Sequence, residues 1–98
     1  MQGEVEMKLA IPIFEEGVSP RFCFAPAVWL VEVEDSAIVS ERMVTMQEHD
    51  FSQRLEQLAA EGVDTILCGG FNRAFIPRSN QLGLRVVCGL SGNARSVV

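Results

Sequence analysis

The stretch that decides the fold is residues 63–88, VDTILCGGFNRAFIPRSNQLGLRVVC. Two short runs rich in β-branched and apolar residues, Val63–Cys68 and Leu84–Cys88, stand at its ends, and Gly83 closes the segment between them. This pattern predicts a strand, a helix over 71–82 and a second strand. A helical crossover makes the two strands parallel, so we predict an α/β domain.

A first helix is predicted upstream of this unit, over Phe51–Glu61. Its apolar residues, among them Leu55 and Leu58, recur at helical spacing. Asp50 is a suitable N-cap residue, and Gly62 follows the last turn, where helices commonly end.

The first half of the chain predicts an antiparallel meander. Three runs have strand character, and they are Met7–Phe14, Val28–Glu34 and Ala37–Val44. Only Asp35-Ser36 separates the last two runs, and a two-residue link is typical of a hairpin. Together with the crossover unit, these runs predict one domain with a mixed sheet and no internal repeat.

Length and composition restrict the class of protein. The chain has 98 residues and is 48% apolar, which favours one compact domain over a disordered tail. Three cysteines cannot all pair, residues 1–6 lack the features of a signal peptide, and no run approaches the roughly 18 apolar residues of a membrane span. We therefore expect a cytoplasmic protein with no membrane partner.

Charge is distributed unevenly along the chain. The formal net charge of -5 argues against a nucleic-acid partner. No acidic residue follows Asp64, however, whereas Arg73, Arg78, Arg85 and Arg95 do. The last third is therefore cationic and compatible with a compact anionic ligand.

Four residues whose sulfur or nitrogen atoms can bind a metal lie at or after the ends of strands that finish at the same edge of the predicted sheet. Cys68 and Cys88 close the two strands of the crossover unit, Cys23 lies in the loop after the first strand, and His49 precedes the first helix. Thiolates suit iron-sulfur and copper-sulfur centres. Arg21 would favour the thiolate of Cys23, which makes that cysteine a candidate ligand or reactive thiol.

Each of these residues also has a structural interpretation. Free cysteine is often a small buried hydrophobe, so Cys68 and Cys88 can serve packing alone. His49 can be a surface or capping residue before the helix. Cys23 has the same alternative of packing, and the residues by themselves leave these choices open.

Glycine-rich loops at this edge are candidate anion sites. They are Gly69-Gly70, followed by Arg73, and Ser91-Gly92, followed by Arg95. Backbone N–H groups of glycines can approach an anion closely at the start of a helix. The structural alternative for Gly69-Gly70 is a tight turn that requires positive φ.

Four segments give the chain a resemblance to the dinitrogenase iron-molybdenum cofactor binding family. They read MKLAIPI, GVSPRFCFAPAVWLVEVED, LAAEGVDTILCGG and LGLRVVCGLSG, and together they run from Met7 to Gly92. The resemblance implies a single-domain ribonuclease-H-like fold over residues 7–98, after a short polar extension at residues 1–6. It also implies a five-stranded mixed sheet in the order 3-2-1-4-5 with helices packed on it.

The first loop departs from the family pattern. The family commonly has Ser-x-His-Phe-Gly-x-Ala, whereas residues 19–25 read SPRFCFA. Arg21 therefore takes the histidine position and Cys23 the glycine position. The family's histidine is therefore absent from this position, and the thiol two residues later either replaces it as a ligand or changes the cluster preference.

The resemblance and the residues together predict a non-catalytic protein that carries or senses an anionic metal-sulfur cluster. The cluster is iron-molybdenum, iron-sulfur or another molybdenum-containing type, and cluster donor and acceptor proteins are the expected partners of a monomer or weak homo-oligomer. Candidate metal ligands are Cys23, Cys68, Cys88 and His49, and the cluster-binding set adds Arg21, Gly69, Gly70, Arg73, Ser91 and Gly92. The alternative is a cluster-free module that binds a small anion or a protein. A two-metal nuclease is not expected, because the first strand contains no carboxylate.

Overall fold

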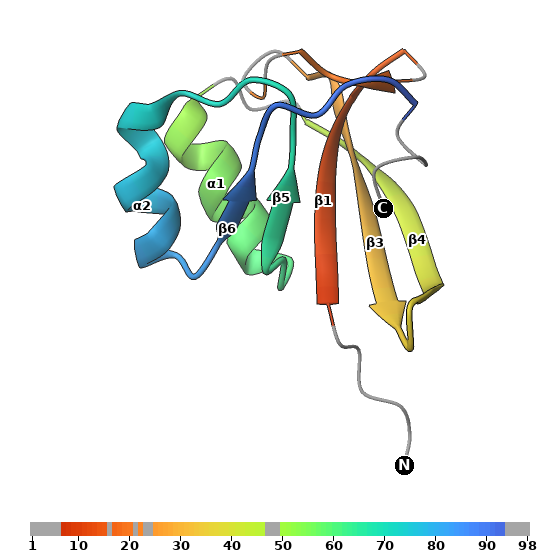
Figure 1. Ribbon diagram of the computed structural model, residues 1–98. Coiled ribbons are helices and arrows are strands. Elements are labelled where there is room, and N and C mark those ends of the chain that lie inside the picture. Colours follow the sequence, from red (N-terminus) through yellow and green to blue (C-terminus); the bar gives the residue numbers. More distant parts are fainter. Residues whose placement is uncertain (1–6, 16, 21, 23–24, 47–49, 94–98) are drawn as a thin grey trace.

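The computed structural model describes residues 7–15, 17–20, 22, 25–46 and 50–93 (Figure 1). Six strands form one mixed sheet, and the helices lie on one side of it. The strands are β1 (Met7–Phe14), β2 (Gly17–Val18), β3 (Ala27–Glu34), β4 (Ala37–Thr45), β5 (Thr65–Leu67) and β6 (Arg85–Val87). The helices are α1 (Phe51–Ala60), the 3-10 helix η2 (Arg73–Phe75) and α2 (Ile76–Gln81). The predicted α/β class with a mixed sheet is confirmed.

The strand order is β4-β3-β1-β5-β6, and β2 pairs with the end of β1 off this path. Without β2, the order along the chain reads 3-2-1-4-5. β1 is antiparallel to β3 and parallel to β5, which is in turn parallel to β6. The sheet thus has one strand more than predicted, because Val18 pairs with Ile13 after a tight turn. Two residues carry no strand signal of their own and become a strand only through this pairing.

Side chains of β1 alternate between two apolar clusters on opposite faces of the sheet. Ala10 belongs to the cluster beneath the helices, together with Leu55 and Leu58 of α1. Ile11 belongs to the cluster on the other face, together with Trp29 of β3. This burial on both faces explains why residues 7–14 are apolar almost without interruption.

The first predicted helix is confirmed, and the second is shorter than predicted. At the start of α1, the Asp50 side chain accepts a hydrogen bond from the Gln53 N–H at 3.1 Å. The second helix is predicted over 71–82. In the structure the Asn72 side chain caps a 3-10 turn, and α2 begins only at Ile76. Pro77 is the reason, since proline lacks an N–H donor and fits an α-helix only in its first turn.

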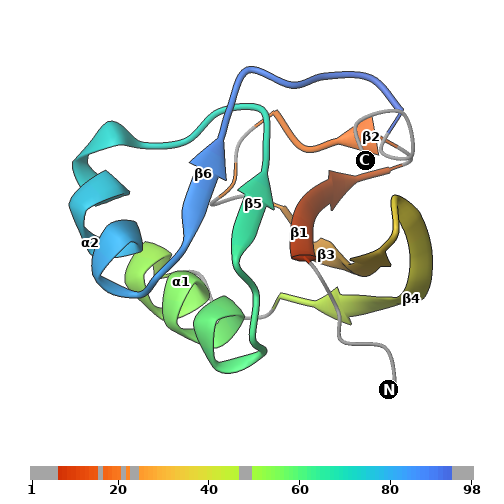
Figure 2. The ribbon, with the colours of Figure 1, turned by 60° about the horizontal axis from the view of Figure 1, so that its bottom comes forward.

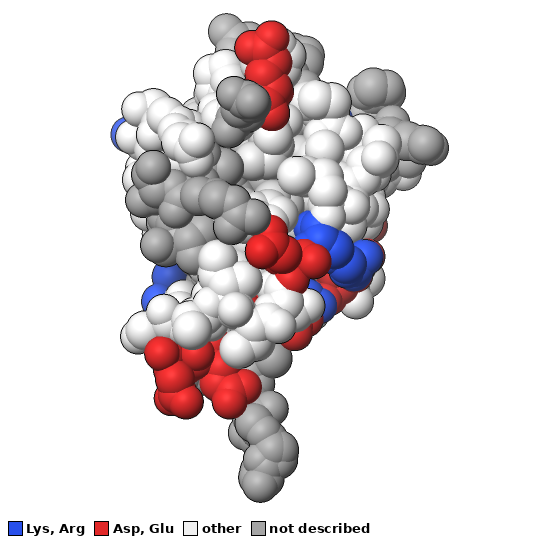
Figure 3. Space-filling model, turned by 90° about the vertical axis from the view of Figure 1, so that its right-hand side faces the viewer, with Lys and Arg blue, Asp and Glu red and all other residues white. Residues whose placement is uncertain are grey.

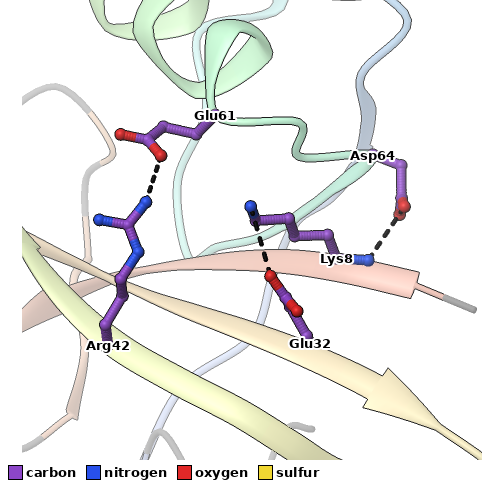
Figure 4. Close-up of polar contacts among 5 residues, drawn as sticks. All are labelled: Lys8, Glu32, Arg42, Glu61 and Asp64. Carbon is purple, nitrogen blue, oxygen red and sulfur yellow. Dashed lines mark hydrogen bonds and ion pairs between the residues drawn. The ribbon is translucent and has the colours of Figure 1, made fainter. Parts of the chain in front are cut away.

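Polar contacts join the ends of the elements (Figure 4). The Lys8 N–H donates to the Asp64 carboxylate at 2.9 Å, and the Asp64 N–H donates back to the Lys8 carbonyl at 3.0 Å. This reciprocal pair sets the register between β1 and the start of β5. Ion pairs of Lys8 with Glu32 and of Arg42 with Glu61 tie β1 to β3 and β4 to the end of α1. Their partial exposure limits each to about 1 kcal/mol or less.

Acidic residues belong mainly to the meander side of the molecule. Figure 3 shows the side formed by β4, where acidic side chains occur at the upper end, in the middle beside basic side chains, and at the lower end of the face. Glu34 is the last residue of β3, Asp35 lies in the turn before β4, and Glu15 follows β1. No helix within the described ranges is both long and apolar enough to cross a membrane.

The predicted hairpin between β3 and β4 is confirmed, and its turn carries backbone strain. Asp35 and Ser36 both have positive φ, at 52° and 64°. Two consecutive residues of this kind form the turn that matches the twist of a two-stranded hairpin, and glycine adopts the conformation without steric cost.

We therefore expect Ser36→Gly to raise the free energy of unfolding by about 0.5–1 kcal/mol. Urea denaturation monitored by circular dichroism measures the change. The matched control is Ser40→Gly, in the exposed middle of β4, which should lower stability because an extended strand gains nothing from glycine. Equal effects of the two substitutions would contradict the assignment of strain to the turn.

Candidate functional site

The candidate site lies where parallel strands end. β1 ends at Phe14, β5 at Leu67 and β6 at Val87, and their pairing directs all three ends to the same edge. We call this edge the rim and define it by the described residues 17–20, 22, 68–70 and 88–92. Ligands of open α/β sheets usually bind at the carboxyl ends of such strands.

Backbone hydrogen bonds join the three loops of the rim. The Gly70 N–H donates to the Pro20 carbonyl at 2.8 Å, and the Phe22 N–H donates to the Gly70 carbonyl at 3.1 Å. On the other side, the Gly89 N–H donates to the Gly69 carbonyl at 2.7 Å. The loop after β5 is thus held between the loops that follow β1 and β6. The segment leading to Cys23 is thereby brought beside the segments that follow β5 and β6.

Gly69 and Gly70 are required by close packing of these loops. A Cβ atom at Gly69 would lie 2.7 Å from the Ser19 carbonyl oxygen, and one at Gly70 would lie 2.6 Å from that of Pro20. Neither residue is among the glycines with positive φ, so the alternative of a turn needing positive φ is wrong. The N–H of Gly70 is already bonded to Pro20, so an anion that used this donor would have to replace that bond.

The structure places Cys68 and Cys88 side by side but in different environments. The Cys68 N–H donates to the Val87 carbonyl at 2.9 Å, and the two cysteines directly follow the paired last residues of β5 and β6, Leu67 and Val87. The Cys68 side chain is fully buried in the core, whereas Cys88 is exposed. Burial, with a smaller contribution from Cys88, raises the pKa of Cys68 to about 12. Cys68 is therefore a protonated, packed thiol at neutral pH, and Cys88 is the accessible one.

The other predicted site residues fall into two groups. Arg73, Ser91 and Gly92 are exposed, and Gly92 accepts a hydrogen bond from the Val18 N–H at 3.0 Å. Arg21, Cys23, His49 and Arg95 lie outside the described residues. Within the described ranges, no three acidic, cysteine or histidine side chains meet in a group able to hold a metal ion.

One residue of the site was missed by the sequence analysis. Arg54 of α1 is only 2% exposed. Its Nη1 atom donates to the carbonyl of Phe22 at 3.1 Å and to that of Ala25 at 2.8 Å. Arg54 therefore holds both described ends of the segment that includes Cys23. Its position between Phe51 and Leu58 on the apolar stripe of the helix was the available signal, because a charged residue there must be paired when buried.

Aromatic side chains of the helices and of the segment before α2 pack against Phe22 of the rim. The Phe22 ring lies 5.0 Å from that of Phe51 and 5.4 Å from that of Phe71, measured between ring centroids. The Phe75 ring stacks on Phe51 at 4.2 Å. These four rings join the first loop, the start of α1 and the segment before α2, so they couple the position of the rim loop to both helices.

Comparison with solved structures shows where this fold has been seen. The structure named PH0822 superposes with a TM-score of 0.87 at 24% sequence identity, covering 93% of this chain and 84% of that one. A protein named provisionally as a dinitrogenase, MJ0327 of Methanocaldococcus jannaschii, superposes with a TM-score of 0.74 at 17% identity, covering 96% and 85%.

A third structure, from Thermotoga, is named provisionally as a NifB protein of the DUF35 family (TM1290). It superposes with a TM-score of 0.70 at 17% identity, covering 92% of this chain and 82% of that one. No family model matches the sequence, and no curated protein matches it. At these identities the likeness establishes the fold alone.

The close approach at Gly70 predicts a specific loss of stability. Gly70→Ala should lower the free energy of unfolding by about 2–3 kcal/mol, because the new methyl group must displace the Pro20 carbonyl. The control is Gly83→Ala, whose φ of +78° is strained but whose added Cβ meets no atom within 4 Å. It should cost only about 1 kcal/mol. Similar losses in the two variants, measured by urea denaturation, would contradict the packing argument.

The difference between the two described cysteines predicts selective alkylation. With iodoacetamide at neutral pH, we expect Cys88 to react at least about 100-fold faster than Cys68, because the reactive thiolate of Cys68 forms only near its raised pKa of about 12. Mass spectrometry of the digested protein gives each rate separately. The difference should vanish in urea, and equal rates in the folded protein would show that Cys68 is accessible.

Proposed function

We propose that the rim binds an anionic metal-sulfur cluster and that the protein carries or senses this cluster without catalysing a reaction. The observation that supports the proposal most directly is that backbone hydrogen bonds join the three loops of the rim. It assembles Cys68, Cys88 and the approach to Cys23 at one edge of the sheet. MJ0327 and TM1290 share this fold and carry nitrogenase-related names, and this likeness supports a nitrogenase-related role.

Arginines close to the rim along the chain or bonded to it favour an anion. Arg73 is exposed three residues after the rim segment 68–70, and the buried guanidinium of Arg54 is bonded to the carbonyls of Phe22 and Ala25. No acidic residue occurs after Asp64 in the sequence. Because a cluster with thiolate ligands is itself negatively charged, nearby arginines would lower the free energy of binding.

The ligand set follows from accessibility. Cys88 is the first candidate, because its thiol is exposed. Cys23 and His49 are further candidates, together with Arg21 as a cation of the first loop. Cys68 would ligate only after losing a strongly held proton, so its main role is to pack the end of β5. The same proposal includes a cluster of iron-molybdenum, iron-sulfur or other molybdenum-containing type, together with the donor and acceptor proteins that supply and receive it. It also includes a monomeric or weakly oligomeric state, a cytoplasmic location and the ribonuclease-H-like classification.

Anaerobic reconstitution with iron, sulfide and molybdate tests the proposal, with bound metal measured by elemental analysis and native mass spectrometry. We expect the wild-type chain to retain a cluster, Cys88→Ser to lose most of the bound metal, and Cys68→Ser to retain more of it than Cys88→Ser. Arg73→Gln should weaken retention, whereas the matched control Arg42→Gln, on β4 away from the rim, should not. Unchanged metal content after replacing all three cysteines would defeat the thiolate version.

The alternative is a cluster-free module for a small anion, and the protonated state of Cys68 favours it. Calorimetric titration of metal-free protein with molybdate separates the two functions. Binding of molybdate that depends on Arg73 but on no cysteine, with no metal-sulfur species in native mass spectra, would support this alternative. A cysteine-dependent increase in mass after reconstitution would support the cluster carrier.

A further inference from the structure

A groove lies between α2 and the edge strand β6. Figures 1 and 2 show α2 beside β6 at the end of the sheet opposite β4. The groove has a volume of about 350 Å³, enough for a small number of side chains. Its lining comes from α2, the following turn and β6, and consists of Ile76, Asn80, Gly83, Leu84, Arg85 and Val86.

The backbone of β6 has an unpaired side in this groove. The Arg85 N–H donates to the Asp64 carbonyl at 2.8 Å, and the Val87 carbonyl accepts from the Cys68 N–H at 2.9 Å. Residues 85 and 87 therefore direct their backbone groups toward β5. Because these directions alternate along a strand, the N–H and carbonyl of Val86 point away from the sheet. No described strand lies beyond β6, so this edge can accept another strand.

The side chains around this edge specify what kind of strand would fit. Ile76 and Val86, which are both half-buried, give the helix side of β6 an apolar surface, whereas Leu84 is buried in the core. Arg85 projects on the opposite face, because its position in the strand alternates with that of Val86. Arg85 is exposed and takes part in none of the ion pairs found among the described residues.

Charge near the groove is positive. Arg78, the basic residue of α2, is paired with Glu56 at 2.9 Å, whereas Arg85 lines the groove itself. An added strand would place alternate side chains against the apolar side and against Arg85. Apolar residues at one set of positions and acidic residues at the other would satisfy both surfaces.

We propose that the α2–β6 groove binds an extended acidic segment of a partner protein, which adds to β6 as a further strand and alternates acidic with apolar residues. The backbone of Val86 provides the strand pairing, the half-buried side chains of Ile76 and Val86 contact the apolar side chains, and Arg85 contacts a carboxylate. This site is separate from cluster binding and does not depend on it.

A peptide titration tests the proposal on the metal-free chain. The probe is a synthetic five-residue peptide that alternates aspartate with isoleucine, added to protein labelled with nitrogen-15. We expect saturable shifts of the amide signals of Val86, Asn80 and Ile76. A peptide of the same composition without alternation, and one with lysine in place of aspartate, should each bind at least about tenfold more weakly. Shifts confined to the rim, or no saturable shift at all, would overturn the proposal.

Two variants distinguish strand addition from general charge attraction. Arg85→Glu should weaken binding of the acidic peptide by at least about tenfold and create binding of the lysine peptide. Arg73→Glu is the matched charge reversal outside the groove and should change either affinity by less than about threefold. Equal losses in these two variants would overturn the groove as the site. Val86→Pro, checked for folding by its amide spectrum, should also abolish binding, because proline removes the N–H donor.

Discussion

The burial of β1 on both faces is the constraint on which the rest of the structure depends. Ala10 and Ile11 are both fully buried, one beneath the helices and the other on the opposite face. A strand of this kind is stable only in the middle of a sheet, so β3 pairs on one side and β5 on the other. The central position of β1 also decides where the site lies, since it brings the end of β1 to the same edge as the ends of β5 and β6.

The rim is held by its own backbone and by side chains from the helix below. Loops usually follow the surface with few mutual contacts, but here the carbonyls of Pro20, Gly69 and Gly70 accept hydrogen bonds from neighbouring loops. Arg54 adds two hydrogen bonds from beneath. A site built in this way is preorganised, because the loops need not lose further backbone freedom when a ligand binds.

β6 links the proposed cluster site to the proposed partner groove. Its carboxyl end leads into Cys88 at the rim, and the backbone of Val86, two residues earlier, faces the groove. A protein segment added to β6 would therefore lie next to the exposed thiol. Such a position suits a protein that delivers the proposed cluster to the rim or receives it from there. The two sites use different atoms and can act separately.

The sequence by itself determined the mixed α/β class, an apolar strand over residues 7–14, the capped helix α1, the two-residue hairpin and the edge of the sheet to which Cys68 and Cys88 belong. These follow from periodicity, capping residues and strand direction, which depend on neighbours along the chain. Only the tertiary structure decided that β2 is a strand, that Cys68 is buried while Cys88 is exposed, and that Arg54 supports the rim loop. It also showed that Gly69 and Gly70 serve close packing. Each of these depends on groups far apart in the chain, because burial and close approach exist only after the loops and strands have met.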